Sequence, residues 1–474
     1  MSEIKVRLTL LRKPPSITCD EKYNVGKDYE VCISGDKYYV YDIVSEDPNI
    51  GATISNIELL LSRMLSEEKV TPDEMLSSIE ERYRHIVQRH YYGYGLLDPL
   101  FIDDNIMDMH IVLGTPIQVL HRKYGPLTTN IQLNQQEMIE LSMRLSSIAG
   151  KIISEATPIA SFIEPRYESR VTIVHFSDIT LRKGMTIDIR KQPSNPWTIL
   201  KLIEMNTATP EEAAFLWLAI KYKVPIMIVG ELMSGKTTFA NAVLNLIPPN
   251  SRIMTIEDTP ELKIHTPFWT RTTIRYSKYN PVHIFDLIKI ALRLTVDYIV
   301  VGEVRGEEAR EWAQAILLGH GGLTTFHAES PEAALIRLTN PPIRVNPEAL
   351  KLLSIFVKMI PIRTYITRKL VRRSEIYVQE DGRLVKVFSY DPASDAIVLS
   401  VDDPLAFDFI KRIALVHGVS EEDLRREYKA MVYVIRSLLE ELKSAGRSVE
   451  EVDYRELPNL LYTKLGEALN RETT

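Results

Sequence analysis

The chain lacks the features that would tie it to a membrane, a secretory route or a nucleic acid. None of its 474 residues lies in an uninterrupted apolar run of the ~18–20 residues that a membrane-spanning helix requires. The first residues, MSEIKVRLTLLRKPPS, carry charges within their apolar run and no small-residue cleavage site, so they do not form a secretory signal. The chain has 57 Lys and Arg against 63 Asp and Glu, a formal charge of −6 that argues against a surface built to coat nucleic acid. We therefore expect a cytoplasmic protein without a nucleic-acid partner.

Cysteine is also scarce. Cys19 and Cys32 are too few for a disulfide framework, and we expect two free thiols, buried or simply tolerated. Internal repeats and low-complexity tracts are absent. The composition, with 45% hydrophobic and 25% charged residues, is typical of a globular protein. Because a single core rarely grows beyond about 250–300 residues, the length predicts two or three domains.

The first half of the chain predicts two regions and a linker. Residues 1–95 combine short β-like runs with a helix that begins at the capping box Thr71-Pro-Asp-Glu74 and continues to about His90. In residues 96–190 the apolar residues first recur at every second position, as in β-strands, around a predicted hairpin. They then return to helical spacing, and this combination is typical of an α/β domain. We expect residues 191–206, which begin with two prolines among small polar residues, to be an interdomain linker.

Residues 207–355 alternate predicted strands and helices, which is typical of a parallel sheet covered by helices on both faces. Residues 356–474 predict a small β patch and then a C-terminal helical region, whose longest helix opens with a capping box at Ser420. The strands predicted in the alternating region are Val224–Val229, Arg252–Ile256, Tyr298–Val301 and Leu323–Phe326, and the helices are Thr237–Leu246, Ile284–Leu294 and Glu307–Leu318.

A phosphate-binding loop is the clearest motif. Gly230-Glu-Leu-Met-Ser-Gly-Lys-Thr237 fits G-x-x-x-x-G-K-[ST], in which glycines let backbone N–H groups approach phosphate oxygens. Lys236 is expected to reach the β- and γ-phosphates of ATP, and the Thr237 hydroxyl to bind Mg²⁺. The loop follows a buried-looking strand and opens a helix, which distinguishes it from a simple glycine turn. The residues predicted to contact nucleotide are Gly230, Glu231, Leu232, Met233, Ser234, Gly235, Lys236, Thr237 and Thr238.

Candidate catalytic residues lie at the carboxyl ends of the neighbouring predicted strands, because parallel sheets bind their ligands at that edge. Glu257 and Asp258 end one strand and are expected near Mg²⁺ or the catalytic water, although a solvated turn would have the same sequence. Glu303 ends the next strand and is the candidate general base for the attacking water, the alternative being a capped strand end. His320 and His327 bracket a further strand; histidines are most often structural, but this pair could sense the γ-phosphate or relay the hydrolysis state.

Taken in order, these segments resemble the type II/type IV secretion ATPase superfamily, the hexameric motors of pilus assembly, protein secretion and archaeal flagella. GELMSGKTT is similar to the Walker A loop of that family and TIEDTPEL to its Asp box. ALRLTVDYIVVGEVRGEEAREWAQAILLGH is similar to the Walker B segment, and GHGGLTTFHAES to the His box. The resemblance extends from about residue 90 to 390, and its upstream part is similar to the archaeal and tight-adherence-type branch.

The resemblance implies an α/β fold. A RecA-like P-loop NTPase motor domain would be preceded by a smaller α/β N-terminal domain and followed by a helical C-terminal extension. The resemblance assigns Glu303 the role of the catalytic Walker B glutamate. It assigns Glu257 and Asp258 the role of the Asp box acids, and His320 and His327 that of the His box pair.

The resemblance also implies that two arginines of the N-terminal domain, Arg170 and Arg190, reach the nucleotide across a domain or subunit boundary. A guanidinium there would offset charge on the transferring phosphoryl group, whereas the alternative is two ordinary surface arginines. The chain departs from the family pattern at Tyr167-Glu168, where Asp-Gly is usual, at Glu231-Leu-Met233, where small residues are usual, and at Leu294-Thr-Val296, where Gln-x-Pro is usual. Because an acid in the loop repels phosphate, Glu231 should face outward or pair with a cation.

The function implied by the resemblance is that of a cytoplasmic homo-hexameric ATPase that uses ATP and Mg²⁺. It would power assembly of a type IV pilus-like surface filament, an archaeal pilus rather than a flagellum, or a secretion machine. Its partners would be a polytopic membrane platform protein and, indirectly, pilin-like subunits, and they would hold it at the inner face of the cell membrane. A conjugation-type motor for DNA or effector translocation would need a basic, aromatic-bearing pore surface, of which the sequence shows no sign. A non-enzymatic docking paralogue is disfavoured because Lys236 and Glu303 are both present.

Overall fold

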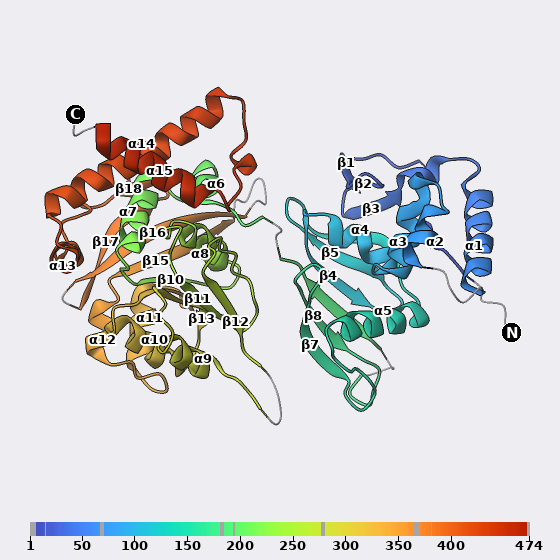
Figure 1. The fold of residues 1–474 in the computed structure, drawn as a ribbon, viewed down its shortest axis with the longest axis horizontal. Coiled ribbons are helices and arrows are strands. Elements are labelled where there is room, and N and C mark those ends of the chain that lie inside the picture. The colour runs from blue at the N-terminus through green and yellow to red at the C-terminus, as the bar shows by residue number, and fades with distance from the viewer. Residues whose placement is uncertain are drawn as a thin grey trace. The chain divides into compact units, whose positions relative to one another are not determined.

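The computed structural model describes residues 6–14, 16–66, 71–180, 184–192, 195–275, 280–363, 370–380 and 382–471. The chain folds as two compact units, Met1–Ser194 and Asn195–Thr474, called here the N-terminal and C-terminal units (Figure 1). In the described residues each unit is built around a nine-stranded sheet with helices packed on it, so the predicted α/β class is confirmed. None of the helices in these residues combines the length and the apolar character needed to cross a membrane.

The sheet of the N-terminal unit has the strand order β1-β2-β3-β6-β5-β4-β9-β8-β7. Its neighbouring strands are antiparallel, except that β3 and β6 are parallel. Its strands are β1 (Glu21–Val25), β2 (Tyr29–Ser34), β3 (Lys37–Asp42), β4 (Ile106–Val112), β5 (Pro116–His121), β6 (Gly125–Gln132), β7 (Ile159–Glu164), β8 (Ser169–Val174) and β9 (Thr186–Arg190). Its longer helices are α1 (Ile50–Ser66), α3 (Arg84–Tyr91) and α5 (Gln135–Ile148).

The predicted division at residue 95 does not coincide with a boundary in this sheet. Strands β1–β3 come from the predicted first region and β4–β9 from the second, and β3 joins β6 through the partners Lys37–Thr128 and Tyr38–Thr129. Side chains of both groups of strands share one hydrophobic core. A three-stranded sheet alone leaves a face to bury, which explains why the two regions fold together.

The prediction of two free thiols is wrong, because Cys19 and Cys32 form a disulfide. Strands β1 and β2 make a hairpin, and the chain just before β1 continues beside β2, where the Asp20 N–H donates to the Ile33 carbonyl. This pairing brings the two cysteine Cα atoms, 13 residues apart in sequence, to 5.3 Å. Two cysteines are too few for a framework, but a single hairpin aligns one pair at bonding distance.

The predicted helix from Thr71 to about His90 is interrupted, although its capping box at Thr71 is confirmed. The hydroxyls of Ser77 and Ser78 donate to backbone carbonyls of their own turn. Such bonds offer the backbone an alternative to continuing the helix. The segment therefore forms the helix α2 (Pro72–Ser77), the 3-10 turn η2 (Glu81–Tyr83) and then α3.

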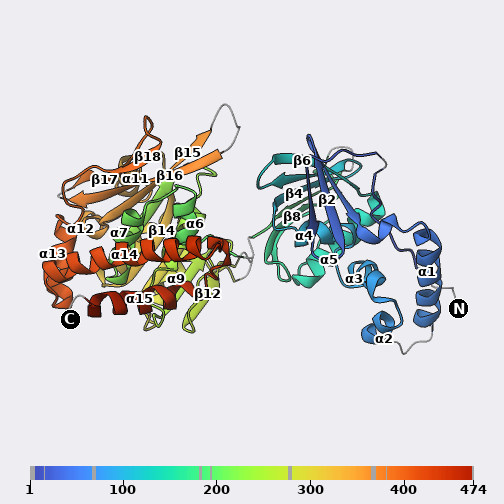
Figure 2. The ribbon, with the colours of Figure 1, turned by 90° about the horizontal axis from the view of Figure 1, so that it is seen from above.

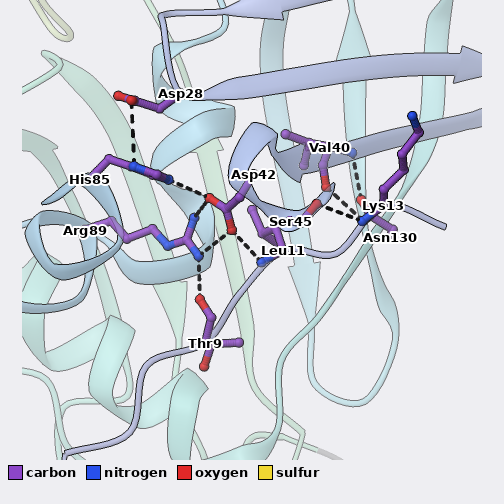
Figure 3. A network of polar contacts seen from close by, with 10 residues as sticks. All are labelled: Thr9, Leu11, Lys13, Asp28, Val40, Asp42, Ser45, His85, Arg89 and Asn130. Atoms are coloured by element: carbon purple, nitrogen blue, oxygen red, sulfur yellow. Dashed lines mark hydrogen bonds and ion pairs between the residues drawn. The ribbon is translucent and has the colours of Figure 1, made fainter. Parts of the chain in front are cut away.

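A buried ion cluster joins α3 to the sheet of the N-terminal unit (Figure 3). Asp42, fully buried at the end of β3, accepts hydrogen bonds from Arg89 at 2.6 and 2.9 Å and lies 3.0 Å from the His85 Nε2 atom. It also accepts a hydrogen bond from the Leu11 N–H at 2.7 Å, which fixes the segment before β1. Burial alone would raise the pKa of Asp42, but the hydrogen bonds and charges of His85 and Arg89 outweigh burial and hold that pKa below its ordinary value.

The sheet of the C-terminal unit has the strand order β12-β11-β13-β14-β10-β15-β16-β17-β18. Its first six strands are parallel, and β15 to β18 continue as an antiparallel extension. The phosphate-loop strand β10 is separated from the acidic strand β13 by one inserted strand, β14, which is the arrangement of a RecA-like motor domain. The strands are β10 (Ile226–Gly230), β11 (Ile253–Glu257), β12 (Trp269–Thr273), β13 (Tyr298–Val304), β14 (Gly321–His327), β15 (Ile355–Arg363), β16 (Leu370–Glu380), β17 (Arg383–Asp391) and β18 (Ala396–Leu399).

Helices cover both faces of this sheet and produce two separate cores. One face holds α6 (Ile199–Glu204), α7 (Pro210–Lys221) and α8 (Lys236–Leu244). Outside α7 lie α14 (Glu421–Ser444) and α15 (Leu457–Arg471), drawn in red in Figures 1 and 2, while α13 (Asp408–His417) precedes them. The other face holds α9 (Ile284–Ala291), α10 (Glu308–Leu317), α11 (Pro331–Thr339) and α12 (Pro347–Leu352).

Two predicted boundaries fall inside structured elements of the C-terminal unit. The predicted linker, residues 191–206, contains α6, whose N-cap Thr198 accepts a hydrogen bond from the Lys201 N–H; residues 193 and 194 lie outside the described residues. The predicted boundary at residues 355 and 356 falls within β15, which pairs with β10. The predicted β patch is therefore a continuation of the motor sheet, because backbone pairing carries that sheet past the phosphate-loop strand.

Candidate active site

The phosphate loop connects β10 to α8 at the carboxyl edge of the parallel strands. Met233 and Gly235 have positive φ angles, 62° and 93°, that turn the backbone inward at the start of α8. Gly230 has no room for a side chain, because a Cβ atom there would lie 2.5 Å from the Ser234 Oγ atom. The tip of the loop, Glu231 to Met233, is exposed, as expected for an acid that must not face phosphate.

Lys236 begins α8 and is folded back onto the loop. Its ammonium donates to the carbonyl oxygens of Gly230 at 3.0 Å and of Glu231 at 2.9 Å. Burial lowers the pKa of Lys236, an effect that the nearby Glu303 carboxylate opposes. The predicted ligands Thr237 and Thr238 follow in the first turn of the same helix.

Lys236 at the start of α8, His327 at the end of β14 and Glu303 in β13 form a continuous line. The His327 Nδ1 atom lies 3.5 Å from the Lys236 Nζ atom, and its Nε2 atom lies 3.4 Å from the Glu303 Oε1 atom. Burial and the charge of Lys236 lower the pKa of His327, so the ring is neutral at pH 7. Arg305 donates to the other Glu303 oxygen at 2.6 Å. An ammonium, an imidazole and a carboxylate are thus gathered beside the phosphate loop within the C-terminal unit.

A bulge in β13 directs Glu303 toward the loop. Val301 is opposite Thr324 in β14 and Glu303 is opposite Thr325, so Gly302 is an extra residue whose carbonyl accepts from the Thr325 hydroxyl at 2.8 Å. Val301 and Val304, three residues apart, both belong to the core on the α9–α12 face. Since side chains alternate along a strand, only the extra residue places Glu303 on the opposite face, where α8 begins.

Glu257 lies beside the bulge. A Cβ atom on Gly302 would lie 3.1 Å from the Glu257 Cγ atom. The Glu257 Oε1 atom accepts from the N–H groups of Glu261 and Leu262 at 2.7 and 2.8 Å, whereas its buried Oε2 atom has no hydrogen-bond partner in the described part of the chain. Burial raises the pKa of Glu257 to about 7. Glu257 therefore holds its turn and directs one unpaired oxygen inward, while Asp258 is half-buried beside it.

The two predicted histidines are not brought together. His327 ends β14 at the loop edge, but His320 precedes β14 at its amino end, where its Nδ1 atom lies 3.0 Å from the Val296 carbonyl oxygen. A strand of this length spans roughly 20 Å at ~3.3 Å per residue. His320 therefore lies at the end of β14 far from the phosphate loop, because the strand between the two histidines is extended. That the pair senses the γ-phosphate or relays the hydrolysis state stays a prediction.

Arg170 and Arg190 lie in the N-terminal unit, whereas the phosphate loop lies in the C-terminal unit. They are direct partners on the neighbouring antiparallel strands β8 and β9, and both are exposed. The Arg190 Nε atom donates to Asp108 of β4 at 2.8 Å. Like charges placed directly opposite across a sheet repel, and the Asp108 carboxylate offsets part of this repulsion.

Sequence reasoning missed two arginines near the loop. Arg305 follows Glu303 closely, and its ion pair with that residue has no signature in sequence spacing. Arg372 of β16 donates to the Met233 carbonyl oxygen at 3.2 Å, although it is far from the loop in the sequence. Neither arginine had a signal in the sequence. The bulge in β13 did have one, because a glycine inside a strand marks such a site.

The comparisons with known proteins agree with the four sequence boxes. The model of the family described as type II/IV secretion system protein matches residues 102–386. An uncharacterized protein of Methanocaldococcus jannaschii is 32% identical over 398 residues, which cover 82% of this chain and 68% of that protein. The type IV secretion system protein PtlH of Bordetella pertussis is 41% identical over 133 residues, which cover 26% of this chain and 38% of that protein.

Among solved structures, the ATPase DotB of Yersinia pseudotuberculosis aligns over 76% of this chain and 91% of its own, with 17% identity and a TM-score of 0.44. The family assignment rests on sequence. The matched segment contains the phosphate loop, Glu257, Glu303 and His327, and it exceeds half of the chain. The resemblance inferred from the sequence is thereby confirmed, and the chain belongs to the type II/IV secretion system protein family.

Proposed function

We propose that the chain is a Mg²⁺-dependent ATP hydrolase that powers a type IV pilus-like filament or a secretion machine. The observation that carries this proposal is the line of Lys236, His327 and Glu303 at the carboxyl edge of a parallel sheet. A purely structural ion network has no need of a glycine loop with positive φ angles beside it. Family membership supports the same reading.

The loop supplies the groups that hold the phosphates of the substrate. Its N–H groups and the N-terminus of α8 favour negative charge, and Lys236 is poised to exchange its two loop carbonyls for phosphate oxygens. Thr237 would hold Mg²⁺, which when bound neutralises charge on the β- and γ-phosphates. Glu257 fits that environment, because its inward oxygen has no hydrogen-bond partner among the described residues and can bind a metal-held water.

Glu303 serves as the general base. The bulge at Gly302 directs its carboxylate to the face where α8 begins, so a water beside the γ-phosphate donates its proton to this carboxylate. Neutral His327 links the Glu303 carboxylate to the Lys236 ammonium, and its ring responds to the charges of these two groups. Arg305 holds the second oxygen and so orients the base.

Arg170 and Arg190 complete the site from the N-terminal unit, across a domain or subunit boundary, in a homo-hexamer. They would offset charge on the γ-phosphoryl oxygens, and their cross-strand pairing supports this role because it holds two guanidinium groups side by side. ATP-dependent closure of the units would be transmitted to a polytopic membrane platform protein and through it to pilin-like subunits. The protein would act at the inner face of the cell membrane. A conjugation-type motor for DNA or effector translocation is the alternative within the same family, and it requires salt-dependent binding of DNA.

The test measures ATP turnover and oligomeric mass together, with and without Mg²⁺. The wild type is expected to hydrolyse ATP only with Mg²⁺ and to assemble with nucleotide. Glu303→Gln is expected to bind ATP but lose turnover by roughly 10²- to 10⁴-fold, as removal of a general base does. Glu307→Gln is the matched control, because Glu307 is exposed at the N-cap of α10, just after β13, and pairs only with Arg310 among the described residues. Wild-type protein that binds ATP yet stays monomeric without turnover would reduce the chain to a nucleotide-gated docking protein.

A further inference from the structure

Strand β16 brings an arginine to the phosphate loop from the side opposite the hydrolytic groups. Strand β15 pairs with β10 and continues past the loop, and β16 returns beside it with Arg372 opposite Pro361. In the strand order, β13 and β14 lie on one side of β10, and β15 and β16 lie on the other. Arg372 therefore faces the loop from the side that Glu303 and His327 leave open.

The Arg372 side chain lies against the loop itself. Its Nη2 atom donates to the Met233 carbonyl oxygen at 3.2 Å. A Cβ atom on Gly235 would lie 2.7 Å from the Arg372 Cδ atom and 3.1 Å from its Nε atom. The Nε–H group is buried and has no hydrogen-bond partner in the described part of the chain. One donor of the guanidinium is thus used, and another is left without a partner at the start of α8.

The charge of Arg372 is not balanced by the described residues. Burial lowers the pKa of this guanidinium, and no carboxylate of the described residues lies within ion-pair distance of it. The neighbouring residue Arg373, on the opposite face of β16, pairs with Asp395 at 3.0 Å. Arg372 instead lies against Gly235 at the N-terminus of α8, and a cation beside the positive end of a helix dipole is unfavourable unless an anion offsets it.

We propose that Arg372 is a nucleotide-binding residue that holds the α- and β-phosphates of a nucleoside di- or triphosphate. The inference rests on the proposed ATPase function. Glu303 and His327 lie on the β13 and β14 side of the loop and fix the γ-phosphate end there, so the diphosphate and nucleoside end extends toward β15 and β16. A planar guanidinium with a free Nε–H group is suited to two phosphate oxygens at once. Arg372 then sets affinity for ADP and ATP alike and leaves the chemical step to Glu303.

The test compares ADP and ATP binding by wild type, Arg372→Gln and Arg372→Met in the full chain, together with turnover at saturating ATP. Both variants are expected to bind ADP and ATP more weakly by the same factor, roughly 10- to 100-fold for the loss of a charge-assisted hydrogen bond. Their kcat should stay within about threefold of wild type, since ground-state and transition-state binding weaken together. Arg383→Gln is the matched control, because Arg383 is exposed at the start of the next strand of the sheet, β17.

Three results would overturn the inference while leaving the ATPase proposal intact. They are unchanged ADP affinity in both variants, loss of affinity for ATP but not for ADP, and a lowered melting temperature with normal affinity, which would make Arg372 only a brace of the loop. If Arg372→Gln does not fold, Arg372→Met decides, because it keeps an unbranched stem against Gly235. If the wild type binds neither ADP nor ATP, the proposed function itself fails and this inference fails with it.

Discussion

At the scale of single residues, Glu212 is a carboxyl group without solvent contact. It lies in the first turn of α7, accepts a hydrogen bond from the Thr209 N–H at 2.9 Å and lies 3.1 Å from the Ser374 hydroxyl oxygen. Burial raises the pKa of Glu212 to about 8, so the group is neutral in the folded chain at pH 7. Ser374 also donates to the Thr207 carbonyl at 2.8 Å, so this contact ties β16, and with it Arg372, to the start of α7.

Glu212 makes the stability of the C-terminal unit depend on pH. Below pH 4.5 the Glu212 carboxyl is protonated in both the folded and the unfolded state. Between pH 4.5 and about 8 only the unfolded chain ionises, so the free energy of unfolding decreases as the pH rises through this range. Above about pH 8 it no longer changes with this group. Glu212→Gln removes this loss, since an amide keeps the contacts without a charge. We expect the variant to match wild type near pH 5 and to exceed it at pH 8.5 by on the order of 3 kcal/mol in the free energy of unfolding.

Urea denaturation of both proteins at the two pH values measures the difference. Glu211→Gln is the matched control, because Glu211 is the preceding residue of α7 but its side chain is 34% exposed and pairs with Arg436. The control should show no pH-dependent gain over wild type. An equal difference between Glu212→Gln and wild type at both pH values would show that burial does not control this carboxyl.

At the scale of elements, the sequence predicted what local patterns encode. The apolar runs Val224–Val229 and Tyr298–Val301 became β10 and β13, and the capping box at Ser420 begins α14. The pairing of β3 with β6 in one sheet and of β10 with β15 in the other depends on contacts between residues distant in the sequence, which no local pattern contains. Arg372 is distant from the loop in the same way, whereas the Cys19–Cys32 pair, 13 residues apart, was missed because it depends on the β1–β2 hairpin. The loop and Glu303 were predicted because adjacent residues indicate them.

The bulge in β13 is an element that the site depends on. Gly302→Ala would place a methyl group 3.1 Å from the Glu257 Cγ atom, so either the bulge or the Glu257 turn must shift. We expect turnover to fall roughly 10- to 100-fold, since displacement of a catalytic group by about 1 Å has effects of this size, while nucleotide affinity is retained. Steady-state kinetics with a parallel binding titration separates the two. Gly466→Ala is the control, because a Cβ atom there meets nothing within 4 Å, and it should retain turnover.

The ion cluster around Asp42 holds the helices and the sheet of the N-terminal unit together (Figure 3). Asp42→Asn leaves Arg89 buried without its counter-charge, and we expect the unit to lose about 3–5 kcal/mol of stability. Because the pKa of Asp42 lies below its ordinary value, the contribution is present above pH 3.8 and is lost as the pH falls through the folded-state pKa.

Thermal melting at pH 7 measures this loss, with nucleotide affinity as a check that the C-terminal unit is intact. Asp28→Asn is the control, since Asp28 is 26% exposed at 3.7 Å from the His85 Nδ1 atom and should cost little. The double variant Asp42→Asn with Arg89→Met should recover part of the stability, because it removes the unpaired charge. A melting temperature unaffected by Asp42→Asn would mean that water solvates Arg89 in solution.

At the scale of the whole molecule, the proposed site would draw residues from both units. The C-terminal unit supplies the phosphate loop, Glu303 and His327, and by the proposal the N-terminal unit supplies Arg170 and Arg190. A motor built this way hydrolyses ATP only when the units are correctly placed. Under this proposal hydrolysis would be coupled to movement, because the arginines would engage the γ-phosphate only in a closed arrangement.

Mixed assemblies test whether the arginines act within one chain or across a subunit boundary. We expect two variants, Lys236→Ala and the double variant Arg170→Gln with Arg190→Gln, each to lose turnover by roughly 10³-fold or more when assembled alone. If the arginines act across a boundary, mixing the two variants restores part of the turnover, because a loop from the arginine variant meets intact arginines from the lysine variant. If they act within one chain, every site in the mixture lacks one component and no turnover returns. Normal turnover by the arginine variant alone would remove Arg170 and Arg190 from the site and leave their cross-strand pairing a feature of the surface.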